Sequence, residues 1–167
     1  MREKLLDRLI SRTWTINGEE ANLRFAPEER LLDVVRNHLA LTGSKPGCEE
    51  GECGTCSILI DGDLKLACLT LAAALPPGTE VTTVEGLAGD AAAKRLKKAF
   101  VAKGAVQCGY CTPGMLVAGY WLLKNPEIEA REGLAGNLCR CTGYQMIVDA
   151  VESCRPRKAV KKTGKKK

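Results

Sequence analysis

Eight of the nine cysteines in this 167-residue chain fall into two groups of four, and groups of thiolates are typical metal ligands. The first group has the spacing C-x4-C-x2-C-x11-C and consists of Cys48, Cys53, Cys56 and Cys68. The second group has the spacing C-x2-C-x27-C-x-C and consists of Cys108, Cys111, Cys139 and Cys141. Each group comes from its own stretch of chain, so the sequence predicts two separate four-thiolate sites. Cys154 is left over and is interpreted as an idle thiol.

The first spacing is the one that plant-type [2Fe-2S] sites use. Two irons that share two bridging sulfides take four thiolates from protein, two for each iron. Gly47, Gly51 and Gly54 alternate with the ligands of this group, and glycine allows the backbone to approach closely. We therefore expect backbone N–H groups to point at the sulfur atoms and to stabilise the negative charge of a cluster.

The second spacing leaves alternatives open. Four thiolates in two short pairs also suit a structural zinc site. Disulfides are disfavoured, because the charged N-terminus has no apolar signal segment and so predicts a cytoplasmic protein. Beside the first group, the interpretation that the residues favour is a carrier of electrons with two [2Fe-2S] clusters.

The elements that must position the first group read as a compact α+β domain. An Asn-Gly turn between apolar alternations predicts a hairpin over residues 14–25, and helical spacing of leucine and valine predicts an amphipathic helix over 27–41. A second hairpin is expected over 57–67, where its far strand delivers Cys68, and a last strand over 81–84.

The second group is expected to lie among helices. Patterns of apolar residues predict helices over residues 91–103, 113–125, 128–134 and 143–153. Cys108 and Cys111 would precede one helix, and Cys139 and Cys141 another. The domain boundaries follow from these elements: an N-terminal extension over 1–12, a first domain over 13–86, a helical domain over 87–154 and a basic tail over 155–167.

The net charge of +5 arises from the tail, because residues 155–167 contain eight of the 25 basic residues and no acid. A solvated tail is the ordinary interpretation of such a run. Aromatic residues make up only 4% of the chain, which argues against nucleic-acid binding, and no stretch is long enough to span a membrane. The only histidine, His38, lies outside both cysteine groups and is not expected to be a ligand.

Three longer motifs carry a resemblance to a known family. They are CEEGECGTC from Cys48, GAVQCGYCTPGM from Gly104 and GNLCRCTGYQ from Gly136. In this order they resemble the iron-sulfur subunit of the molybdenum hydroxylases, the family of xanthine dehydrogenase, aldehyde oxidase and carbon monoxide dehydrogenase. The resemblance covers roughly residues 13–154.

The resemblance implies a ferredoxin-like β-grasp domain followed by a four-helix bundle, each with one [2Fe-2S] cluster. It also implies a large partner subunit that binds the molybdopterin cofactor and oxidises the substrate, and a medium subunit that binds FAD and accepts electrons. The second group would hold the cluster nearer to molybdenum, and the first group the cluster that passes electrons outward. Gln107 matches the family glutamine that hydrogen-bonds the pterin. The chain itself would have no catalytic residue.

Two other functions remain open at this point. A free-standing ferredoxin would carry electrons between independent partners, although such a carrier needs only the first domain. A zinc-stapled interaction module would carry no electrons and would be colourless.

Overall fold

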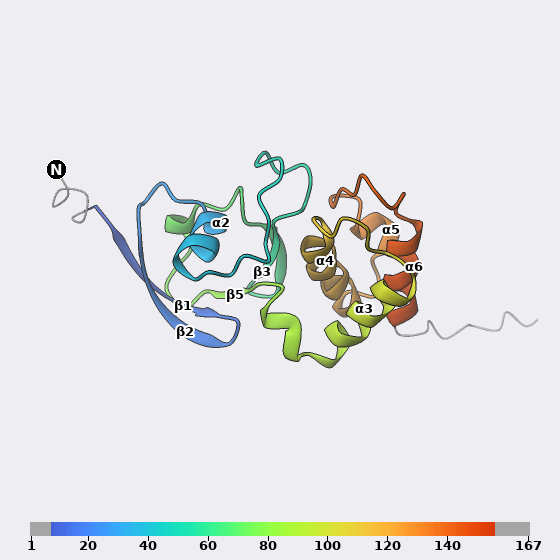
Figure 1. The fold of residues 1–167 in the computed structure, drawn as a ribbon. Helices are drawn as coiled ribbons and strands as arrows, with labels where there is room; N and C mark the ends of the chain where they lie inside the picture. Colours follow the sequence, from blue (N-terminus) through green and yellow to red (C-terminus); the bar gives the residue numbers. More distant parts are fainter. Residues whose placement is uncertain (1–7, 156–167) are drawn as a thin grey trace, which may run out of the picture.

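The computed structural model describes residues 8–155, which form a five-stranded sheet and a group of helices side by side (Figure 1). The strand order in the sheet is β2-β1-β5-β3-β4. The strands are β1 (Ile10–Ile16), β2 (Glu19–Phe25), β3 (Ser57–Ile60), β4 (Asp63–Leu66) and β5 (Glu80–Thr82). Strand β5 runs parallel to β1 and antiparallel to β3, and all other neighbours are antiparallel.

Both predicted hairpins are present, and each has a two-residue turn. Asn17 and Gly18 join β1 to β2 with φ angles of 55° and 88°, and Asp61 and Gly62 join β3 to β4 with 50° and 84°. Two successive positive φ angles match the right-handed twist of paired strands. Strand β1 begins at Ile10 and so includes three residues of the range 1–12 predicted as an extension.

The helix predicted over 27–41 is shorter in the structure. It consists of α2 (Leu31–Asp33) continued by a π-helical segment, η1 (Val34–His38). Its start is delayed because the backbone of Arg30 pairs with that of Leu71. It ends before Ala40, whose φ angle of 55° does not continue a right-handed helix.

The sheet and this helix enclose one hydrophobic core. Trp14 and Phe25 are fully buried at its centre, with ring centroids 5.3 Å apart. Cys56 and Cys68 lie in the same cluster of buried side chains. Two of the four thiols of the first group are therefore anchored by the core of the sheet-containing half.

The second half is helical, and each predicted segment contains a helix. These helices are α3 (Ala91–Ala102), α4 (Thr112–Lys124), α5 (Ala130–Gly133) and α6 (Gln145–Cys154). Helix α3 packs against α4 and α6 around a core that includes Phe100, Met115 and Ile147. Because α5 is a single turn, the four-helix bundle stays a prediction. Of the part of the chain that the structure describes, no helix has the length and apolar character to cross a bilayer.

The start of α3 is fixed by Asp90. Its carboxylate accepts hydrogen bonds from the backbone amides of Ala92 (2.6 Å) and Ala93 (3.0 Å), as an N-cap residue does. Both bonds lower the pKa of Asp90, and the bond from Ala93 has the larger effect. The linker to the sheet is a short 3-10 helix, η3 (Gly86–Gly89).

At the other end, Arg155 belongs to the folded body, although it falls in the range predicted as a tail. Its side chain is only 6% exposed and donates to the carbonyl oxygens of Pro126 and Ile128. The rest of the predicted tail, residues 156–167, and the first seven residues of the predicted extension lie outside the described residues.

Candidate metal centres

The first cysteine group lies in two segments that the sheet holds together. Cys48 and Cys53 are half-buried in the loop between η1 and β3, and Cys56 lies at the end of that loop. Cys68 follows β4 by two residues and is buried. The β3–β4 hairpin thus brings Cys68 back to Cys56, as the sequence predicted.

Backbone amides of this loop point at the sulfur atoms. The N–H groups of Glu50 and Glu52 donate to the Cys48 Sγ (3.4 and 3.3 Å), and the N–H of Cys48 donates to the Cys53 Sγ (3.4 Å). A Cβ atom on Gly47 would lie 2.8 Å from the Cys53 Sγ. The loop therefore wraps so closely around its sulfurs that only glycine fits there, which is the cradle expected for a cluster.

The thiols of the first group are close neighbours. The Cys48 N–H donates to the Cys53 Sγ, and the segment of Cys68 is bonded to Cys56 through the Ala67 N–H and the Cys56 carbonyl oxygen (3.3 Å). The hydrogen bond from the Glu50 amide is the main cause that lowers the pKa of Cys48 to about 7, whereas burial raises the pKa of Cys56 to about 12. A thiol must lose its proton to bind a metal, so the affinity of this group for a metal depends on pH.

The second group is arranged in the same way between the helices. The Sγ atoms of Cys108 and Cys141 are 3.5 Å apart and exposed. Cys111, immediately before α4, interacts with Cys139, and both are half-buried. Two sulfurs bound at about 2.3 Å to one tetrahedral metal lie roughly 3.8 Å apart, so the first pair already has nearly the required spacing.

In the second group, the pKa values of Cys111 and Cys141 are raised and that of Cys139 is lowered. Burial raises the pKa of Cys111 to about 12, and the hydrogen bond with Cys108 raises that of Cys141. Burial acts to raise the pKa of Cys139 as well, but hydrogen bonds led by that from Thr142 outweigh it and leave the pKa lowered. Hydrogen bonds to the Cys139 sulfur thus stabilise its negative charge.

The residues around Cys139 are the part of this site that sequence reasoning missed. The Tyr144 amide donates to the Thr142 Oγ1 (3.2 Å), and the Thr142 hydroxyl donates to the Cys139 Sγ (3.2 Å). The Tyr144 hydroxyl accepts the Cys139 N–H (2.9 Å). Tyr144 has a φ angle of 71°, which is strained for an aromatic residue. In this conformation the amide and the hydroxyl of Tyr144 both bond to the ligand loop.

Replacing Thr142 with valine is therefore expected to lower the reduction potential of a cluster bound by the second group. Valine keeps the shape but removes the hydroxyl that stabilises negative charge on the Cys139 sulfur. The loss of one charge-assisted hydrogen bond, about 1.5 kcal/mol, corresponds to about a tenfold change in the reduction equilibrium. Redox titration followed by paramagnetic resonance measures the reduction potential of this cluster. Thr142→Ser is the control and should retain the potential.

Gln107 is exposed at the surface beside the exposed Cys108, and it comes from the loop between α3 and α4. Three large side chains of the two ligand loops are also exposed: Val106, Tyr110 and Leu138. Gln107 is thus an exposed residue directly before Cys108 in the chain, and its contact with a pterin stays a prediction.

The two cysteine groups are joined by direct hydrogen bonds. The Leu138 N–H donates to the carbonyl oxygen of Cys53 (2.8 Å). The buried Asn137 side chain donates to the Gly54 carbonyl oxygen (2.8 Å) and to Ser57. The Tyr110 hydroxyl donates to the Pro46 carbonyl oxygen. Sequence reasoning had no signal for these contacts, because they depend on how the two halves pack.

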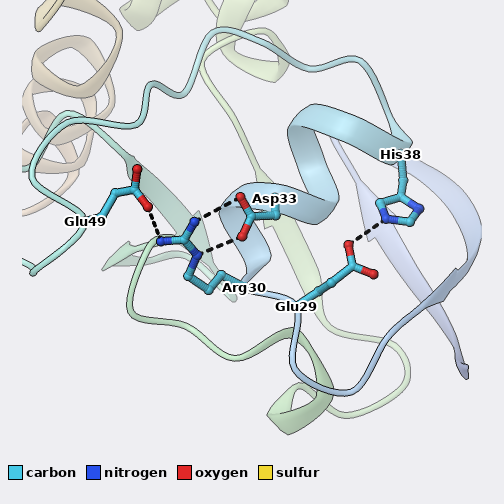
Figure 2. A network of polar contacts seen from close by, with 5 residues as sticks. All are labelled: Glu29, Arg30, Asp33, His38 and Glu49. Carbon is cyan, nitrogen blue, oxygen red and sulfur yellow. Dashed lines mark hydrogen bonds and ion pairs between the residues drawn. The ribbon is translucent and has the colours of Figure 1, made fainter. Parts of the chain in front are cut away.

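Charged side chains form three pairs, shown in Figure 2. Arg30 pairs with Asp33 and with Glu49, which follows Cys48 directly. His38 pairs with Glu29 through its Nε2 (2.8 Å). The network of Arg30 was not predicted from the sequence.

Within residues 8–155, no three His, Cys, Asp or Glu side chains converge on one point that could hold a single metal ion. The Sγ atoms of Cys108 and Cys141 are 3.5 Å apart, and amides and a hydroxyl point at the sulfurs of Cys48, Cys53 and Cys139. A cluster of two irons takes two thiolates for each iron, so the residues present fit this group. When bound, such clusters accept and release single electrons.

Comparison with known proteins defines the class. A family model described as "2Fe-2S iron-sulfur cluster binding domain" matches residues 14–73, and one described as "[2Fe-2S] binding domain" matches residues 83–152. The chain is therefore a protein with two successive [2Fe-2S]-binding domains. The zinc interpretation of the second group has no support from these matches.

Relatives narrow the class to one family. The xanthine dehydrogenase iron-sulfur-binding subunit of Escherichia coli O157:H7 is 44% identical over 150 residues, which cover 86% of this chain and 93% of that protein. The crystal structure of quinoline 2-oxidoreductase from Pseudomonas putida 86 matches with a TM-score of 0.78 and 43% identity over 86% of this chain and 91% of that chain. The aldehyde oxidoreductase of Megalodesulfovibrio gigas is 42% identical over 149 residues, 86% of this chain but only 16% of that protein.

These likenesses confirm the resemblance found in the sequence. The chain belongs to the iron-sulfur subunit family of the molybdenum hydroxylases, whose members include xanthine dehydrogenases and aldehyde oxidoreductases.

Proposed function

We propose that this chain is the electron-transfer subunit of a molybdenum-dependent oxidoreductase of several subunits. It would carry electrons from a large subunit with the molybdopterin cofactor to a medium subunit with FAD, in the cytoplasm, and would do no bond chemistry on the substrate. Relatives named as iron-sulfur subunits of dehydrogenases, such as the xanthine dehydrogenase subunit, support this function.

Each domain would hold one [2Fe-2S] cluster. The first domain, residues 13–86, would use Cys48, Cys53, Cys56 and Cys68. The helical domain, residues 87–154, would act as a four-helix bundle around Cys108, Cys111, Cys139 and Cys141. The pairs of thiols suggest which two bind the same iron: Cys108 with Cys141, whose sulfurs are 3.5 Å apart, and Cys111 with Cys139.

The observation that carries the proposal is the hydrogen bond from the Leu138 N–H to the Cys53 carbonyl oxygen (2.8 Å). Leu138 is bonded directly to Cys139, so this one contact joins a ligand of each group through a few covalent bonds. Asn137 holds the same two loops together from a buried position. A carrier with two clusters needs such a fixed, short connection, because each electron must cross between them.

Exposed side chains at both cysteine groups suit the docking of partner subunits. Cys108 and Cys141 are exposed beside Gln107 and an apolar surface, which suits docking of the large subunit and contact with its pterin. At the first group, Leu69 and Leu71 are exposed close to Cys68 along the chain. These two leucines suit contact with the flavin subunit. Exposed apolar side chains in the segments of both cysteine groups favour a subunit of a complex over a free-standing carrier.

Analysis of anaerobically purified protein tests the function. We expect about four irons and four labile sulfides per chain, brown colour, and two paramagnetic signals after reduction with dithionite. Mass spectrometry of the proteins that copurify with the native chain should identify a molybdopterin-binding partner. A colourless protein, or one that contains zinc and gives no signal on reduction, would contradict the proposal.

A further inference from the structure

Arg30 makes contacts on both sides of its guanidinium group (Figure 2). Its Nε and Nη2 donate to the two carboxylate oxygens of Asp33 (2.7 and 3.2 Å), and its Nη1 donates to the Glu49 carboxylate. The bidentate pair with Asp33 fixes the plane of the guanidinium. The third donor is then held in place to bind Glu49.

The backbone around Arg30 is fixed to the other ligand segment of the first group. Arg30 forms a β-bridge with Leu71, three residues after Cys68. The Leu31 N–H donates to the Thr70 carbonyl oxygen (2.7 Å) on the same segment. Arg30 thus connects the segment that contains Cys68, through its backbone, with the loop that contains Cys48, through its side chain.

Glu49 has an unusual backbone conformation that explains why such a contact is needed. Its φ angle is 59°, in the left-handed region that residues with a Cβ enter at a cost. This conformation turns the chain so that the next amide, that of Glu50, donates to the Cys48 Sγ, and Glu52 follows. The side chain of Glu49 points back to Arg30 and holds the turn.

We propose that Arg30 is a positioning residue for the first cluster, which anchors Glu49 and thereby keeps the backbone amides on Cys48 and raises the reduction potential of that cluster. The inference rests on the proposed function, because it requires a cluster at the first group. It assigns a redox role to a residue that lies outside every cysteine motif.

The positive charge of Arg30 and its anchoring of Glu49 both raise the reduction potential of the first cluster. Removal of its positive charge leaves Asp33 and Glu49 as two unpaired carboxylates near the cluster, which disfavours the added electron. Removal of its donors also frees the loop whose amides stabilise that electron. The side chains of Arg30 and Glu49 are 36% and 42% exposed, so solvent screens their contribution to folding. The effect should therefore appear in the potential more than in stability.

The first test compares Arg30→Met with Arg24→Met in the complex with its native partners. Arg24 is an exposed residue of β2 and serves as the matched control for loss of one positive charge. We expect Arg30→Met to shift the reduction equilibrium of the first cluster about threefold to tenfold towards the oxidised form. At 59 mV per tenfold change, this is a decrease of about 28 to 59 mV. Redox titration with paramagnetic detection resolves the two clusters separately.

A second pair of variants separates position from charge. Glu49→Gln removes the negative charge but keeps an oxygen that accepts from Arg30, so the potential should rise. Glu49→Ala removes the same charge and the anchor, so its potential should fall below that of Glu49→Gln. Arg30→Lys keeps the charge without the planar fork and should recover only part of the loss.

The inference is overturned if Arg30→Met and Arg24→Met give the same potential, or if the two Glu49 variants do. Both comparisons require that the unaltered protein contains the first cluster and that this cluster can be reduced. If that cluster is absent from the unaltered protein, the proposed function itself fails, and iron analysis reveals this before any variant is made.

Discussion

Replacing Cys111 with serine is expected to remove the second cluster and to leave about two irons and two labile sulfides per chain. Cys111 lies half-buried against Cys139 immediately before α4. A serine hydroxyl stays protonated where a thiol ionises, and oxygen is a poorer ligand than sulfur for iron in such clusters. One iron would lose half of its protein ligands, and the cluster would not be retained.

The variant also tests the order of transfer in the proposed complex. Substrate should no longer reduce the first cluster, because its electrons would have to cross the empty second site. Dithionite reaches the first cluster from solution and should still reduce it. The visible absorbance after each reductant measures the two routes independently.

Cys154→Ser is the control for this experiment, since Cys154 belongs to neither cysteine group. It should keep about four irons and normal reduction by substrate. If substrate still reduces the first cluster in Cys111→Ser, the assigned order of the clusters is wrong. Circular dichroism checks that α3, α4 and α6 remain folded, so that loss of the cluster is not confused with loss of the domain.

The hairpins and helices could be predicted because local residues determine them. Asn17-Gly18 and Asp61-Gly62 adopt the positive φ angles that short hairpin turns need, whatever the rest of the chain does. Helix α4 begins with Pro113 in its first turn and ends before Pro126, as its sequence indicates. The two groups of four cysteines could also be recognised from the sequence, because metal ligation demands fixed residue types at fixed spacing.

Contacts between distant segments could not be predicted in this way. The helix predicted over 27–41 begins late because Arg30 pairs with Leu71, 41 positions further along the chain. The strained conformation of Tyr144 has no local signal, since an aromatic residue rarely adopts a φ angle of 71°. Packing of the ligand loop, and the hydrogen bonds that it makes possible, hold Tyr144 there.

The same limit applies to the connection between the two cysteine groups. The sequence indicated two sites but nothing about which residues of one group contact the other. Leu138 reaches Cys53 where the two halves of the protein pack together, and α4 also contacts the sheet through β3. Gly114 in the first turn of α4 lies against the backbone of Gly54 and Thr55, directly after Cys53.

Replacing Gly114 with alanine is expected to destabilise the protein and to loosen the contact between the cysteine groups. A Cβ atom at this position would lie 2.4 Å from the Gly54 carbonyl oxygen and 3.0 Å from that of Thr55. Both are backbone atoms of the first ligand loop, which cannot rotate away as the end of a side chain can. Overpacking of this kind costs about 1–3 kcal/mol of the free energy of unfolding.

The sign of this effect is informative because alanine normally favours a helix over glycine by about 1 kcal/mol. Gly119→Ala in the same helix gains the same propensity and meets only side-chain atoms of Leu96 and Val151, at 3.0 and 3.1 Å. We expect Gly114→Ala to be the less stable of the two in urea unfolding, and to slow electron exchange between the clusters. Equal stability and equal exchange rates would mean that α4 can move away from the first ligand loop at little cost. The hydrogen bond from Leu138 to Cys53 would then be too loose to fix the route of the electron.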